Sequence, residues 1–268
     1  MTLEPVTVMV RGRAHTVPVA ELRAELDAEG PPRSLASLEA ILRCGDREAA
    51  VARLRRIVRR GDPGVGTLQA IFGLVRLHAR DASEDLEALA VRLGGSPGAI
   101  ATAAAALVGD RVERLAADVA DDATLAHASP QPYLHESRVP DGAPALFAAW
   151  IATLRREAPN VGVTALRAFV GDVAEAAFRS LQHGAHAGAL LGDADREFLV
   201  DTICAELPGT TDFIAARGMA WLLGALQPGD ETARAAIERA RDRFRDPEFQ
   251  ADCEAMLQGG AWPPQLQP

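Results

Sequence analysis

The side chains best suited to binding an anion gather on one predicted helix, at residues 46 to 60. Arg53, Arg56 and Arg60 recur at i, i+3 and i+7, so they share one face of that helix. Residues 43 to 60 hold seven arginines against two acids, a net charge of +5. Guanidinium groups bind carboxylates and phosphates through paired hydrogen bonds. The pattern predicts either an anion-binding face or a solvated face paired with acids of neighbouring helices.

A second group of polar side chains occupies the proline-rich segment 128–143. It contains Tyr133, which is the one tyrosine of the chain, together with His135 and Arg138. Long connections without regular structure are usually functional loops or linkers. The segment therefore predicts either a loop that binds a ligand through these three residues or a connection between two helical halves.

Signatures of catalysis and metal binding were sought along the whole chain. The sequence has no GxSxG elbow, no GxxxxGK[ST] loop, no HExxH and no GxGxxG motif. His183 and His186 stand at i, i+3, but the glycines beside them indicate a fraying helix end more than a rigid ligand platform. No cofactor or metal is therefore expected. An enzyme with a His/Tyr-containing pocket near residues 127–138 is the alternative.

Charge and cysteine content bear on the partners and the compartment. The net charge of −9 makes nucleic acid an unlikely partner, although residues 1–80 carry a net +4 and residues 81–268 a net −13. Cys44, Cys204 and Cys253 form no CxxC pair, which favours a reducing compartment. There is no apolar run of about 18 residues and no signal-peptide pattern at the N-terminus. A cytoplasmic protein with no membrane contact is expected, and its oligomeric state stays open.

The N-terminus alternates apolar and polar residues with a period of two. Val6, Val8 and Val10 enclose Thr7 and Met9, and an extended pattern resumes after Gly12. Alternation around a glycine turn is typical of a β-hairpin. Two strands are marginal alone, so the hairpin must pack on helices or gain another strand. Thr7 and Met9 are therefore predicted binding residues at its edge.

From Val19 onward the apolar spacing is helical almost to the end of the chain. Several segments start at a capping aspartate, as at Asp46, Asp230 and Asp246, and end at a glycine, as at Gly61. Short turns between them imply antiparallel neighbours. The predicted helices cover residues 19–29, 34–44, 46–60, 65–79, 83–93, 97–107, 110–120, 144–157, 161–182, 194–207, 211–226, 230–244 and 247–258.

The Asp-led turns recur at 16 to 19 residues, so a helix pair takes about 35, the period of helical-repeat proteins. With the turn Asp246-Pro247-Glu248, this spacing resembles HEAT-like and armadillo-like α-solenoids. The predicted fold class is all-α, either a HEAT-like stack or an irregular helical bundle, with a small N-terminal β-hairpin. The predicted parts are 1–30 with the hairpin and first helix, a helical half at 31–127, the loop 128–143, a second helical half at 144–260, and a proline-rich tail at 261–268.

Stacked helices present extended surfaces, and an unpaired strand accepts a peptide by strand addition. The expected function is therefore a non-catalytic binding or scaffold protein for a peptide or protein segment. A helical groove and the hairpin edge are the expected surfaces. Two alternatives remain open: the enzyme described above, and a helical-repeat nucleic-acid binder that uses the arginine cluster at 43–60.

Overall fold

The structure is a computed structural model of the chain, and it describes residues 3–10, 12–158 and 162–258. Helices dominate, and one two-stranded antiparallel sheet lies at the N-terminus, which confirms the all-α class with a small hairpin. Two compact units follow each other, unit 1 ending at Arg111 and unit 2 starting at Val112. The segment 128–143, a predicted connection between halves, thus lies inside unit 2. The predicted tail 261–268 lies outside the described residues.

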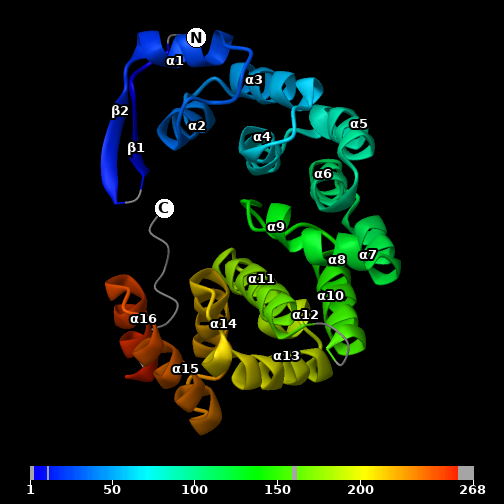
Figure 1. Cartoon of the computed structure of the whole chain (residues 1–268), viewed down its shortest axis with the longest axis vertical. Helices are drawn as coiled ribbons and strands as arrows, with labels where there is room; N and C mark the ends of the chain where they lie inside the picture. The colour runs from blue at the N-terminus through cyan, green and yellow to red at the C-terminus, as the bar shows by residue number, and fades with distance from the viewer. Residues whose placement is uncertain (1–2, 11, 159–161, 259–268) are drawn as a thin grey trace. The chain divides into compact units, whose positions relative to one another are not determined.

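Unit 1 is built from helix pairs arranged in two layers. Helices α1, α3 and α5 contact one another in sequence, while α4 packs on α6 and each odd-numbered helix packs on the next even-numbered one (Figure 1). This arrangement is compatible with a helical-repeat fold. The elements are β1 (Val6–Val10), β2 (Arg13–Val17), α1 (Val19–Asp27), α2 (Leu35–Leu42), α3 (Arg47–Arg60), α4 (Val65–Arg76), the short 3-10 turn η1 (Arg80–Ala82), α5 (Ser83–Leu93) and α6 (Gly95–Val108).

Unit 2 also forms two rows of helices. One row runs through α11, α14 and α16, and the other through α10, α13 and α15. Trp150 and Phe147 are fully buried in its core. The elements are α7 (Val112–Asp121), α8 (Ala123–Ala128), α9 (Pro130–Tyr133), α10 (Ala143–Glu157), α11 (Val163–Gln182), α12 (Ala187–Leu190), α13 (Asp193–Glu206), the 3-10 turn η2 (Leu207–Gly209), α14 (Phe213–Leu226), α15 (Glu231–Arg243) and α16 (Pro247–Leu257).

The predicted aspartate caps are present at the starts of α3, α15 and α16. The side chain of Asp46 accepts from the amide of Ala49 at 3.0 Å, and Asp230 accepts from Ala233 at 2.8 Å. Such a bond satisfies one of the first-turn amides that have no partner inside the helix. Asp246 caps α16 in the same way. Helix positions could be predicted from sequence for this local reason.

Helix ends are closed by arginines that come from neighbouring helices. Arg92 of α5 donates to the carbonyls of Arg59 and Val58 at 2.7 and 2.9 Å, at the end of α3. Terminal carbonyls lack intrahelical donors, and a cation there also opposes the helix dipole. The same contact joins Arg47 to Leu77 and His78, Arg156 to Ala120, Arg179 to Leu134, Arg167 to Gly209 and Arg243 to Pro208. Arginine thus links the ends of helices to neighbouring helices within each unit.

Helix length and hydropathy were also compared with the thickness of a bilayer. None of the helices in the described ranges is both long enough and apolar enough to span one.

Candidate functional site

The N-terminal hairpin is anchored on one face and open on the other. Val8 and Val17 are buried, at 1% and 4% exposure, in a cluster with Leu22, Ile41 and other apolar residues of α1 and α2. Thr7 and Met9 point to the opposite face, where Met9 is 59% exposed. The alternation that predicts the hairpin therefore separates an anchoring face from a free one.

The backbone of the hairpin has two edges whose outward groups make no backbone hydrogen bond to another element among the described residues. The turn between the strands has two residues, and Val10 pairs with Arg13 beside it. In a hairpin of this kind the pair next to the turn exchanges main-chain hydrogen bonds, and so does every second residue pair after it. Thr7 and Met9 on β1, and Ala14 and Thr16 on β2, therefore turn their amides and carbonyls outward. Among the described residues, no backbone hydrogen bond joins these groups to an element outside the hairpin.

The edge of β1 opens onto a groove beside the turn between α2 and α3. Residues 4–7 line one wall, and Arg43, Cys44 and Gly45 line the other, around a volume of about 510 Å³. Gly45 has no neighbour within 4 Å of the place where a Cβ would stand. An extended segment could enter here beside the first residues of β1.

The edge of β2 is more open still. Residues 13 to 16 are exposed along the whole strand, and only Val17 at its end is buried. Figure 1 shows β1 between β2 and α2, so β2 is the outer strand of the hairpin. Both edges expose the hydrogen-bonding groups that an added strand needs.

The arginine cluster of α3 is used inside unit 1. Arg53 is fully buried and donates to the carbonyls of Glu25 and Gly30, and Arg56 donates to that of Leu26, at the end of α1. Arg60 pairs with Asp62 at the surface, at 2.5 Å. The predicted pairing with acids of a neighbouring helix holds for Arg55 and Arg59, which bind Asp85 of α5. Arg53 and Arg56 bind main-chain carbonyls instead, and burial places Arg53 out of reach of a ligand.

The segment 128–143 is partly helical and partly buried. Tyr133 is 3% exposed, donates to or accepts from Ser180 Oγ at 2.9 Å, and packs edge-on against Phe147 and Trp150. His135 and Arg138 are exposed. Tyr133 is thus a core residue, and the three predicted residues do not converge on one surface. The short helix α9 was missed because Pro130, at its first position, and Pro132 resemble loop punctuation, and α8 was missed although Asp122 caps it.

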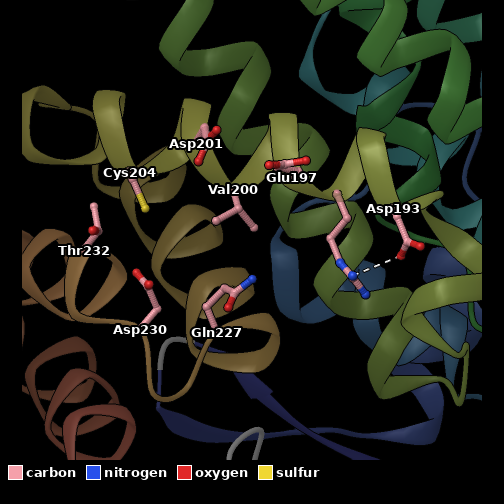
Figure 2. Close-up of a pocket in the computed structure, with 9 residues that line it drawn as sticks. Asp193, Glu197, Val200, Asp201, Cys204, Gln227, Asp230 and Thr232 are labelled. Atoms are coloured by element: carbon pink, nitrogen blue, oxygen red, sulfur yellow. Dashed lines mark hydrogen bonds and ion pairs between the residues drawn. The ribbon is translucent and has the colours of Figure 1, made fainter.

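Unit 2 has a groove that the sequence analysis did not find. Figure 2 shows it between α13 and the turn from α14 to α15, with Asp201, Cys204 and Asp230 around it. Its volume is about 370 Å³, and Asp193, Glu197 and Asp201 recur at every fourth residue of α13. That i, i+4, i+8 spacing of acids is the signal that would have indicated an acidic face.

The surroundings of the Cys204 thiol in this groove favour its protonated form. Burial raises the pKa of the Cys204 thiol, and the charges of Asp230 and Asp201 raise it further, so the thiol stays protonated at neutral pH. Within the described residues, His, Cys, Asp and Glu side chains nowhere form a group of three or more suited to hold a metal ion.

A half-buried carboxyl group lies where α11 meets the start of α14. Burial raises the pKa of Asp172 to about 7, and the negative charges of Glu175 and Asp212 contribute. Folding thus raises this pKa above its unfolded value of 3.8, so the folded state binds the proton more tightly. The free energy of unfolding should therefore fall as the pH rises from 3.8 to 7, and the whole of this loss is present above pH 7.

The Asp172→Asn variant removes this ionisation while keeping the shape of the side chain. We expect it to raise the free energy of unfolding by about 1 kcal/mol at pH 8, after allowance for solvent screening. The gain should disappear near pH 4. Urea unfolding across this pH range measures it, with Asp121→Asn at an exposed position as the matched change of charge. An equal gain at both pH values would mean that packing, not ionisation, is responsible.

Comparison of the chain with protein-family models, with curated proteins and with solved structures finds no match.

Proposed function

We propose that the chain is a non-catalytic binding protein that takes an extended peptide or protein segment as an additional strand on its N-terminal hairpin. The observation that carries the proposal is that both edges of the hairpin have no main-chain partner among the described residues, while one face of the hairpin is fixed to the core. Main-chain hydrogen bonds supply affinity in strand addition, and alternate side chains supply specificity.

The rigidity of the hairpin supports this role. An isolated two-stranded hairpin is marginal in water. Here Val8 and Val17 pack with Leu22 and Ile41, and Thr7 and Thr16 are joined across the strands at 2.9 Å. The edges are therefore held in the extended conformation before any partner arrives, which lowers the entropy lost on binding.

The two strands offer a matched pair of test positions. Met9 and Ala14 face each other in the ladder and both turn their amides outward. Proline at either position removes one outward donor and places its ring on that edge, while the bonds between β1 and β2 stay in place. Deleting the hairpin is a poorer test, because it would also expose the core around Leu22 and Ile41.

Peptides selected from a random phage-displayed library on the wild-type protein should lose binding to either Met9→Pro or Ala14→Pro. We expect at least a tenfold loss, since several main-chain hydrogen bonds depend on edge access. Circular dichroism of both variants should match the wild type. Selected peptides that bind both proline variants with wild-type affinity would refute strand addition.

A further inference from the structure

The hairpin carries basic side chains and no acidic one. Between Pro5 and Ala20 the sequence contains Arg11, Arg13 and His15 but neither aspartate nor glutamate. Arg13 and His15 are both exposed on β2, and their pairing with Val10 and Val8 places both side chains on the anchoring face of the hairpin, at its outer strand. An uncovered strand edge and two polar nitrogen donors thus coincide on β2.

These two side chains differ from most basic groups of unit 1 in having no partner. Arg53, Arg56 and Arg92 hold helix ends, and other arginines pair with acids, as Arg55 does with Asp85 at 2.6 Å. Between described residues, no ion pair or side-chain hydrogen bond of Arg13 or His15 is found. The charge of Arg13 and the nitrogen donors of both side chains are therefore available to something outside the chain.

We propose that the edge of β2 accepts an acidic extended segment, one with carboxylate side chains at alternate positions. This inference rests on the proposed strand addition, and it specifies which edge the partner occupies and which side chains the partner carries. A strand hydrogen-bonded to β2 through Ala14 and Thr16 would bring two of its own side chains beside Arg13 and His15. Because side chains on one face recur at every second residue, acids at i and i+2 meet both groups.

The distribution of charge indicates that an acidic segment would bind at the β2 edge and not at the β1 edge. The groove beside β1 is lined by one acid and one base, Glu4 and Arg43, and Arg43 already lies 3.5 Å from Glu39. The strand β1 itself has no charged residue. Complementary charge fixes the register of a partner and suppresses wrong partners, and only the β2 edge offers it.

The test uses two blocked synthetic peptides of equal length. In one, glutamate alternates with threonine, and in the other, glutamine replaces each glutamate. Isothermal titration of the full chain should give tighter binding of the glutamate peptide by about fivefold or more, with an affinity that falls as salt rises. Arg13→Gln should lower its affinity about three- to fivefold and leave the glutamine peptide unchanged.

Two control variants separate this inference from the proposal on which it rests. Arg60→Gln removes an arginine from unit 1 away from the hairpin and should leave binding unchanged. Ala14→Pro should abolish binding of the glutamate peptide, and Met9→Pro should not. Equal affinities of the two peptides, no measurable binding of the glutamate peptide, or loss of its binding in Met9→Pro alone would overturn the acidic β2 site. The proposal of strand addition would be refuted only if library-selected peptides bound Met9→Pro and Ala14→Pro with wild-type affinity.

Discussion

Replacing Arg53 with alanine should lower the free energy of unfolding by about 3 to 5 kcal/mol, because two carbonyls that it engages would each lose a charged donor. The guanidinium is fully buried and donates to the carbonyls of Glu25 and Gly30. The Glu25 carboxylate beside it is also buried, and its ion pair with Arg33 is long, at 3.5 Å. Without Arg53, the two carbonyls would lose their donor, and the Glu25 carboxylate would lose a nearby positive charge.

The same helix supplies the control. Arg60 pairs with Asp62 at the surface, where both side chains are more than half exposed. Arg60→Ala should therefore change the free energy of unfolding by no more than about 0.5 kcal/mol. Urea denaturation followed by circular dichroism measures both variants. Equal losses in the two would contradict the assignment of Arg53 as the link between α3 and the end of α1.

A lysine variant separates charge from geometry at this position. Arg53→Lys keeps the positive charge but replaces the planar fork with a single ammonium group. It should recover only part of the stability lost in Arg53→Ala, because one ammonium group is less able to reach two separated carbonyls. Full recovery would mean that the charge near Glu25 matters and the carbonyl contacts do not.

In unit 2, Gly171→Ala is expected to lower the free energy of unfolding by about 2 kcal/mol. A Cβ at Gly171 would lie 2.5 Å from the Cα of Ala215 on α14, so the two helices would have to separate. Overpacking of this kind costs about 1 to 3 kcal/mol. At this short distance we expect an overpacking cost of about 3 kcal/mol, at the upper end of that range. The better helix propensity of alanine recovers about 1 kcal/mol of it.

Gly188→Ala is the matched control for that variant. Gly188 is exposed on α12, and a Cβ there would meet only the His186 ring at 3.6 Å, an ordinary contact. The free energy of unfolding should stay within about 0.5 kcal/mol of the wild-type value. A comparable loss in both variants would show that glycine at 171 does not set the distance between α11 and α14.

Much of the fold could be predicted because its signals are local. The Asp46, Asp230 and Asp246 caps and the period of the apolar residues are properties of neighbouring positions, and they gave the helix positions to within a few residues. The hairpin likewise follows from alternation around a two-residue turn. Thr7 and Met9 were therefore placed on the open face of β1 by sequence alone.

The candidate site depended on contacts between residues far apart in the chain. From sequence, Arg53, Arg56 and Arg60 are three equivalent arginines on one helix face. Packing of α3 on the end of α1 buries Arg53, engages Arg56 and leaves Arg60 at the surface. Tyr133 changed from a predicted binding residue to a core residue for the same reason, since Phe147, Trp150 and Ser180 enclose it.

The sequence by itself determined which segments are helical, where they begin and that the chain opens with a hairpin, because hydrogen bonding within a turn and side-chain periodicity need only near neighbours. Only the tertiary structure showed which charged side chains are paired within the chain and which are not. Many of the arginines bind a carbonyl or carboxylate about 30 positions away in the sequence, as Arg55 binds Asp85. Arg13 and His15 stand out only after the partners of the other arginines are known.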